Sequence, residues 1–297
     1  MTETAQAEPS ATVIADSVSA VTGIRLTTIE VTLHRFVLSE LNTHRAFSRN
    51  SASSRAIPSR LTRERVAASP AMPMVWASEQ PGMQGGLPLS DKQAAEAARL
   101  WLQGRDAVLD VAESLSKLGV HRSLVNRLLE PWMWHTVIIS ATDWDGFFEQ
   151  RCSPLAMPEI RLAAEAMRSA MYHSEPSEVD RDGWHLPYVR EDELALPLQV
   201  LRRVSAARCA RVSYLTHDGV RDIEEDLRLF RRLATARPMH ASPLEHVATP
   251  AGCLDEPLGN FQGWVQYRHA FHAADLLADP ETLNLSVELA NSPPRPA

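Results

Sequence analysis

Residues 25–55 read RLTTIEVTLHRFVLSELNTHRAFSRNSASSR, and this stretch decides the fold class. At its start, Ile29, Val31 and Leu33 alternate with polar side chains, and a period of two is typical of a strand with one buried face. A short segment from Val37 then leads into a run of arginine and hydroxyl side chains. We therefore expect residues 25–36 to form a half-buried strand that leads into a basic loop.

Long helical patterns follow this strand. Ser90 and Gln93 form a capping box for a helix that runs to Leu118 and is closed by Gly119. Strands mixed with long helices, without a regular βαβ alternation, predict an α+β (or α/β) fold with a mixed sheet flanked by long helices. The further expected elements are a loop over residues 71–89, a helix ending at residues 130–131, a strand over 136–141, a helix capped by Thr142 and Asp145, helical spacing over 160–171 and 223–233, and a loop over 182–188.

The two ends of the chain differ in composition from its middle. Residues 1–20 are polar and acidic, and the last residues, SPPRPA, cannot form a helix. We expect residues 1–20 to be a flexible leader, residues 21–290 a single folded domain and residues 291–297 a tail.

Composition narrows the class of partner. The 297 residues carry 30 basic and 37 acidic side chains, a formal charge of −7, which argues against a nucleic-acid binder. Cys152, Cys209 and Cys253 lie far apart and are odd in number, so they indicate neither a disulfide framework nor a CxxC zinc site. No apolar run approaches the roughly 20 residues that span a bilayer. The sequence predicts a cytoplasmic protein without a metal, a membrane or a nucleic-acid partner.

Arginine is concentrated in one region. Lys92 and Lys117 are the only lysines, and residues 31–65 contain seven arginines against Glu40 and Glu64. Guanidinium groups interleaved with hydroxyl side chains, as in residues 43–55, are suited to a phosphate monoester. A solvated serine-rich loop explains the same composition, so both interpretations stay open.

Two further segments invite a functional interpretation. In residues 240–246, HASPLEH, Ser242 as N-cap, Pro243 at the first helical position and Glu245 predict a helix start, which also offers free amides to an anion. Arg127 and Arg151 flank the strand over 136–141. They are either ordinary surface arginines or, if the chain turns back, a pair that converges on an anion and a polarised heterocycle.

Residues 43–55 resemble the signature of the flavin-dependent thymidylate synthases. That signature is an arginine-histidine-arginine triplet, seven residues and a serine. His44, Arg45 and Ser53 match it, and Thr43 replaces the first arginine. The matching segments cover most of residues 25–270 and include 119–131, the block ending at Arg151, 210–214 (ARVSY) and 240–246.

The order of these segments is unusual for that family. The segments at 210–214 and 240–246 ordinarily precede the strand that leads into the triplet, whereas here they follow it. Residues 261–268, FQGWVQYR, resemble the approach to the triplet and end on an arginine. We hypothesise that Arg268 replaces the arginine missing at Thr43.

The resemblance implies a homotetramer with active sites at subunit interfaces, and makes residues 21–290 the catalytic domain. Such enzymes methylate C5 of uracil, converting dUMP to dTMP, with FAD as cofactor and with methylenetetrahydrofolate and NADPH as co-substrates. Arg151 would lie at the uracil edge and favour ionisation at N3. The nucleotide would be bound by Glu40, Ser51, Ala52, Ser53, Ser54, Arg55 and Arg127, and the flavin by His44, Arg45, Ser213, His240, Ser242, Glu245 and Arg268.

Departures from the family pattern leave alternatives open. Ser51 stands in place of a glutamate, Ala56 in place of an aromatic residue and Gly146 in place of an asparagine, which predicts a roomier pocket. The acceptor is therefore dUMP or, as in a branch of the family that serves polyoxin antibiotic biosynthesis, UMP. A non-catalytic nucleotide-binding protein and a phosphate-ester hydrolase are the readings from other classes. The loop over residues 184–187 has no expected role.

Overall fold

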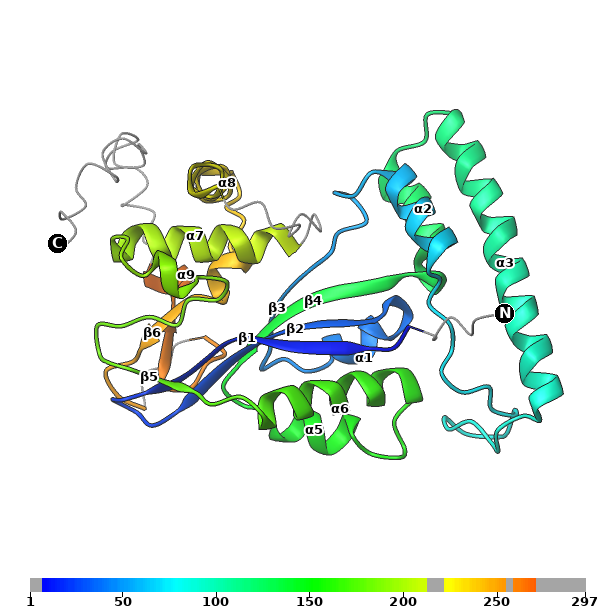
Figure 1. Cartoon of the computed structure of the whole chain (residues 1–297), viewed down its shortest axis with the longest axis horizontal. Helices are drawn as coiled ribbons and strands as arrows, with labels where there is room; N and C mark the ends of the chain where they lie inside the picture. Colours follow the sequence, from blue (N-terminus) through cyan, green and yellow to red (C-terminus); the bar gives the residue numbers. More distant parts are fainter. Residues whose placement is uncertain (1–6, 213–221, 255–258, 271–297) are drawn as a thin grey trace.

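The computed structural model describes residues 7–212, 222–254 and 259–270, and its centre is a five-stranded sheet (Figure 1). The strand order is β3-β4-β2-β1-β5, with β1 and β5 parallel and the other pairs antiparallel. This mixed sheet with flanking helices confirms the predicted α+β class. The strands are β1 (Ser10–Ser19), β2 (Arg25–His34), β3 (Ser48–Ser51), β4 (Trp134–Ala141) and β5 (Ser177–Val179).

The predicted strand is the middle of the sheet. On one face of β2, Ile29, Val31 and Leu33 are fully buried against α5 (Asp145–Arg151) and α6 (Pro158–Tyr172). Each such side chain stabilises the fold by roughly 1.5–3 kcal/mol relative to an exposed one. Both α5 and α6 lie below the sheet in Figure 1.

The opposite face of the sheet carries helices at both ends. In Figure 1, α7 and α8 lie over the end that holds β5, whereas α2 and α3 stand at the other end. The Ser90–Gln93 capping box begins α3 as predicted, and Gly119 follows its end with φ +81°. The helices other than α5 and α6 are α1 (Leu38–Asn42), α2 (Ser59–Ala68), α3 (Asp91–Lys117), α4 (Arg122–Val125), α7 (Leu198–Arg211), α8 (Ile223–Thr235) and α9 (Tyr267–Ala270).

Shorter elements complete the described chain. A second, antiparallel sheet pairs β6 (Ala248–Pro250) with β7 (Trp264–Gln266). The 3₁₀ segments are η1 (Arg35–Val37), η2 (Asn126–Trp132), η3 (Glu191–Glu193) and η5 (Ser242–Glu245). The helix expected to end at residues 130–131 is therefore α4 followed by η2, which contains Pro131.

Two sequence expectations about elements are wrong. Residues 10–19, expected to be part of a flexible leader, form β1, because their backbone pairs with β2 on one side and β5 on the other. Thr142 does not cap α5, whose preceding residue Trp144 has helical dihedrals. The Thr142 hydroxyl instead accepts a hydrogen bond from the Gln262 amide. The expected tail, residues 291–297, lies outside the described residues.

A buried hydrogen-bonded chain crosses the sheet and gives the loop over residues 184–187 a structural role. His185 Nδ1 bonds Ser17 Oγ at 2.8 Å and His185 Nε2 bonds Thr28 Oγ1 at 2.7 Å. Thr28 Oγ1 bonds Ser140 Oγ at 2.6 Å, which in turn bonds His246 Nδ1 at 2.8 Å. Burial lowers the pKa of His185 and of His246 to about 3, so both imidazoles are neutral.

No helix in the described part of the chain is long and apolar enough to cross a membrane.

Candidate functional site

The basic loop after β3 is held by buried contacts. The Ala52 amide donates to the Thr136 carbonyl at 3.1 Å, and Asn126 Nδ2 donates to the carbonyls of Ser54 and Ile57 at 2.8 and 2.9 Å. Asn126 is fully buried. These contacts anchor the loop at Ala52, Ser54 and Ile57, while Arg55 stays exposed to solvent.

Guanidinium groups surround this loop. A hollow of about 400 Å³, which we call the arginine hollow, is lined by Leu38, Asn50, the predicted nucleotide residues Ser51, Ala52, Ser53, Ser54, Arg55 and Arg127, and also Arg35 and Arg49. Guanidinium forks beside hydroxyl groups provide the donors that a phosphate ester requires. Of the predicted nucleotide residues, only Glu40 lies outside this hollow.

One carboxylate that the sequence analysis did not single out orients the arginine hollow. Glu130 Oε1 accepts hydrogen bonds from Arg35 Nη2 at 3.2 Å and from Ser54 Oγ at 3.0 Å, and lies 3.8 Å from Arg127 Nη1. Arg35 Nη1 also donates to His135 Nε2 at 2.9 Å. Burial, together with the Arg35 charge, lowers the pKa of His135 to about 3, so that the imidazole can accept this bond.

The segment at residues 240–243 meets the basic loop in a second hollow. This hollow of about 360 Å³, the junction hollow, is lined by Asn50, Ser53, Arg55, Ala56, Arg122, Ala210, Leu233, His240, Ser242 and Pro243. Ser242 Oγ donates to Asn50 Oδ1 at 3.5 Å, across 192 positions in sequence. Asn50, Ser53 and Arg55 line both hollows, so the two hollows adjoin.

The helix start expected at Ser242 is found only as a short 3₁₀ turn, and Ser242 is not its N-cap. Residues 242–245 form a four-residue 3₁₀ turn, preceded by Ala241 and without a side-chain cap. Because Ser242 faces Asn50 instead of the turn's own amides, the segment offers no helix N-terminus to an anion.

The residues that resemble the family triplet, 43–45, line a third hollow. Thr43, His44, Arg45, Ala46, Phe47, Asp143, Gly146, Phe147 and Gln150 enclose about 430 Å³, which we call the histidine hollow. Arg151 Nε donates to His44 Nε2 at 3.0 Å, and Arg151 Nη2 donates to Thr43 Oγ1 at 3.0 Å and to the Glu40 carbonyl at 3.3 Å. Since a guanidinium group can only donate, His44 carries its proton on Nδ1. Burial, with the Arg151 and Arg49 charges, lowers the pKa of His44 and keeps it neutral.

The described chain does not bring all predicted residues together. Arg127 lines the arginine hollow, whereas Arg151 lies beside His44, so the two guanidinium groups do not converge within one chain. Arg268 pairs with Glu245, and the guanidinium that contacts Thr43 is that of Arg151. Ser213 lies outside the described residues.

The described residues bear on two further kinds of site, a metal cage and a reactive thiol. They contain no group of three or more histidine, cysteine, aspartate or glutamate side chains that could hold a metal ion. Cys152, Cys209 and Cys253 are free, and burial raises the pKa of the Cys152 and Cys209 thiols. Thiols with raised pKa values are poor nucleophiles near neutral pH.

No protein-family model and no curated protein matches the chain. Among solved structures, the fold is similar to two of the UMP/dUMP methylase PolB from Streptomyces cacaoi. The structure with 5-Br dUMP has 14% identity and a TM-score of 0.46, over 56% of this chain and 90% of that one. The structure with 5-Br UMP has 16% identity and a TM-score of 0.47, over 56% of this chain and 89% of that one.

Proposed function

We propose that the protein is a flavin-dependent enzyme that methylates C5 of a uridine monophosphate, with dUMP as acceptor and dTMP as product. The observation that carries the proposal is the junction hollow. There, Ser53 and Arg55 of the family-like signature face His240 and Ser242, which come from the other distant segment that resembles the family. UMP is the alternative acceptor, because the small Ser51 and Ala56 leave room around the sugar.

The arginine hollow is the proposed phosphate site. Arg55 and Arg127 would bind the phosphate oxygens, and Ser53 and Ser54 would add hydroxyl donors. The Glu130 carboxylate holds Arg35 and Ser54 in place before the nucleotide arrives. This preorganisation lowers the entropic cost of binding.

The histidine hollow is the proposed flavin site. Its donor set fits FAD, because Arg45 offers an exposed guanidinium and Gln150 an amide. Beyond the residues next to Gly146 and the backbone of its own helix, no atom lies within 4 Å of the place where a Cβ of Gly146 would stand. When bound, FAD supplies the redox chemistry of methyl transfer, with methylenetetrahydrofolate as carbon donor and NADPH as reductant. Neutral His44 orients the Arg151 guanidinium through its Nε2 atom.

Arg151 is the proposed catalytic residue. A guanidinium at the uracil edge favours ionisation at N3, which raises electron density at C5 and makes that carbon nucleophilic. Arg127 lines the arginine hollow, whereas Arg151 contacts His44 of the histidine hollow. We therefore also propose a homotetramer in which a second copy brings the two guanidinium groups together.

Product formation tests the proposal. Purified protein is incubated with FAD, NADPH, methylenetetrahydrofolate and either dUMP or UMP, and the methylated nucleotide is detected by mass spectrometry. We expect dTMP from the native chain, none from Arg151→Ala, and native turnover from Arg161→Ala, which removes an arginine that lines none of the three hollows. Absence of product from both acceptors contradicts the enzymatic proposal. Binding of dUMP by a colourless protein would then support the nucleotide-binding alternative.

A further inference from the structure

A fourth hollow shares no lining residue with the three of the candidate site. It measures about 490 Å³ and lies between α2 and the sheet face that points away from α5 and α6 (Figure 1). We call it the α2 hollow. The lining residues that a ligand would use are Glu30, Arg65, Trp132, Met133 and Trp134.

The α2 hollow combines flat apolar walls with one charge of each sign. Trp132, Trp134 and Met133 supply large apolar surfaces. Glu30 comes from β2 and Arg65 from α2, and no ion pair between described residues involves either side chain. A pocket of this size and composition is typical of small-molecule sites, in which a few polar groups fix the orientation of an apolar ligand.

The Glu30 carboxylate is held in one orientation by Tyr188. The Tyr188 hydroxyl donates to Glu30 Oε2 at 2.5 Å. No hydrogen bond within the described chain uses the other oxygen, Oε1. Because Glu30 lines the α2 hollow, Oε1 is the carboxylate oxygen that remains for a ligand.

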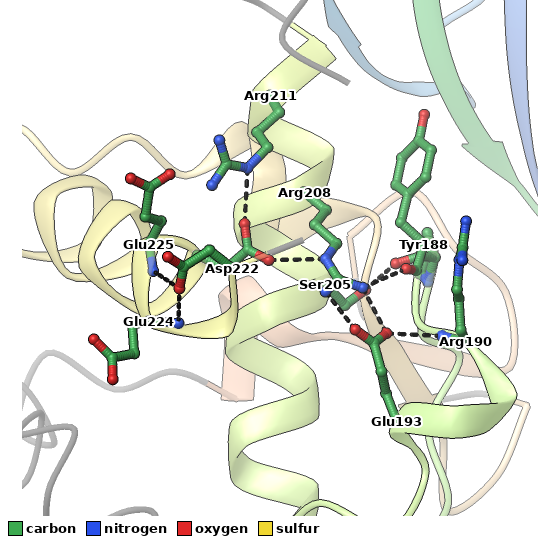
Figure 2. A network of polar contacts seen from close by, with 11 residues as sticks. Tyr188, Arg190, Glu193, Ser205, Arg208, Arg211, Asp222, Glu224 and Glu225 are labelled. Carbon is green, nitrogen blue, oxygen red and sulfur yellow. Dashed lines mark hydrogen bonds and ion pairs between the residues drawn. The ribbon is translucent and has the colours of Figure 1, made fainter. Parts of the chain in front are cut away.

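The backbone at Tyr188 is itself held under strain. Its φ is 64°, and it is the single non-glycine residue of the described ranges with a positive φ. Arg208 Nη1 donates to the Tyr188 carbonyl at 2.8 Å, and Arg208 is fixed in turn by Glu193 at 2.5 Å and by Asp226 at 2.8 Å. Figure 2 shows the Tyr188 ring pointing away from this ionic network, toward the sheet. Strained residues held by a rigid surrounding are characteristic of functional sites.

We propose that the α2 hollow binds a planar heteroaromatic acid, whose ring N–H donates to Glu30 Oε1 and whose acidic group pairs with Arg65. The flat walls select a ring. A purely apolar ligand would remove water from the Glu30 carboxylate without offering it a hydrogen-bond donor. A ligand without an acidic group would leave the Arg65 guanidinium without an ion-pair partner in the hollow. The site is separate from the one proposed for the nucleotide, and its occupation does not depend on that function.

Two isosteric probes test the acceptor role of Glu30. Indole-3-acetate carries a ring N–H, and benzofuran-3-acetate has a ring oxygen in its place. Isothermal titration calorimetry of the native chain is expected to give at least a tenfold preference for indole-3-acetate, because the furan oxygen faces a carboxylate oxygen. Equal affinity, or no binding of either probe at millimolar concentration, overturns the proposal.

The Glu30→Gln variant is expected to reverse the preference between the two probes. Its amide oxygen must accept from Tyr188, so the amide nitrogen faces the hollow and turns the acceptor into a donor. We expect the preference for indole-3-acetate to disappear or to reverse toward benzofuran-3-acetate. A loss of both affinities by the same factor, in a variant with a native circular dichroism spectrum, also overturns the proposal.

Arg65→Gln tests the acidic end of the ligand. It is expected to weaken indole-3-acetate at least fivefold and to leave neutral 3-methylindole unchanged, whereas Arg60→Gln on the same helix changes neither. The probe titrations are repeated in saturating dUMP. Unchanged affinity supports a separate site, and displacement by dUMP contradicts it.

Discussion

At the scale of single residues, Arg127 is an exposed guanidinium of the arginine hollow. Its side chain is 58% exposed, and its recorded ion pair is with Glu130 at 3.8 Å. It therefore contributes little to the fold, since an exposed pair of this kind is worth about 0–1 kcal/mol. Its removal should change binding more than stability.

We predict that Arg127→Gln weakens dUMP binding about tenfold and leaves 2′-deoxyuridine binding unchanged. A hydrogen bond to a charged group is worth roughly 1.5–3 kcal/mol, and only the nucleotide carries the phosphate. Calorimetric titration of both ligands measures the difference, with Arg161→Gln as the matched control. Equal weakening of nucleotide and nucleoside would remove Arg127 from the phosphate site.

Some single residues of the candidate site could be predicted from the sequence, and others could not. The spacing of His44, Arg45 and Ser53 identified the loop, because family signatures depend on local sequence. Glu130 was missed, since a carboxylate three residues after Arg127 resembles an ordinary surface pair. Its role depends on Arg35 and Ser54, which lie 95 and 76 positions away.

At the scale of elements, α7 and α8 are joined by buried charges. Arg208 on α7 is 8% exposed in its side chain, and Asp226 on α8 is 1% exposed. Asp226 also accepts from Arg211 Nε at 2.7 Å. In Figure 2, Arg208 lies where the two helices and the segment carrying Glu193 meet. A buried ion pair is costly to break, because the partner left behind stays charged and desolvated.

We predict that Asp226→Asn destabilises the protein by about 3 kcal/mol. The neutral amide leaves Arg208 with one carboxylate, Glu193, and leaves Arg211 without its buried partner. Urea unfolding followed by circular dichroism measures the change. Glu224→Gln, which removes an exposed pair with Arg228 on the same helix, is expected to cost less than about 1 kcal/mol. If the two variants lose the same free energy of unfolding, the buried ion pairs of Asp226 contribute no more to stability than an exposed pair.

Elements with a strong local pattern could be predicted, and those that depend on distant partners could not. The Ser90 capping box and the alternation in β2 are local signals, and a helix and a strand form at these places. The expectation of a half-buried strand is wrong in part, because Thr28 and His34 on the polar face are also fully buried. β1 was missed because its sequence is polar and its stability comes from hydrogen bonds to β2 and β5. Ser242 had the sequence of a helix start, but its contact with Asn50 belongs to the tertiary structure.

At the scale of the whole molecule, three of the four buried histidines of the described residues make the fold sensitive to acid. Burial lowers the pKa of His135, His185 and His246 from 6.5 to about 3. Below pH 6.5 these three histidines are protonated in the unfolded chain, whereas in the folded chain they stay neutral until the pH approaches 3. The stability that these neutral imidazoles provide is therefore complete above pH 6.5 and is lost as the pH falls toward 3.

We predict that the free energy of unfolding falls by on the order of 1 kcal/mol per buried histidine between pH 6.5 and 5.5. Urea titrations at several pH values in this window measure the slope. His121→Gln, at an exposed histidine, should leave the slope unchanged. A flat profile between pH 7.5 and 5.5 would mean that the three imidazoles accept protons in the folded state.

The candidate site as a whole could be predicted only in part. Ser53, predicted to bind the nucleotide, and Ser242, predicted to bind the flavin, line one hollow although they are far apart in sequence. The meeting of Arg127 with Arg151 did not occur within a single chain, and no sequence pattern specifies which surfaces a second copy covers. The α2 hollow is lined by residues of β2, α2, η2 and β4, so no short sequence motif predicts it.

The inner position of β1 also determines how far the gene can be shortened in the laboratory. A shortened protein that starts near residue 25, where the predicted strand begins, would lack β1. The backbone N–H and C=O groups of β2 that pair with β1 would then be without partners. Such a version should accumulate as insoluble material, whereas an affinity handle placed before residue 7 would leave the paired backbone intact.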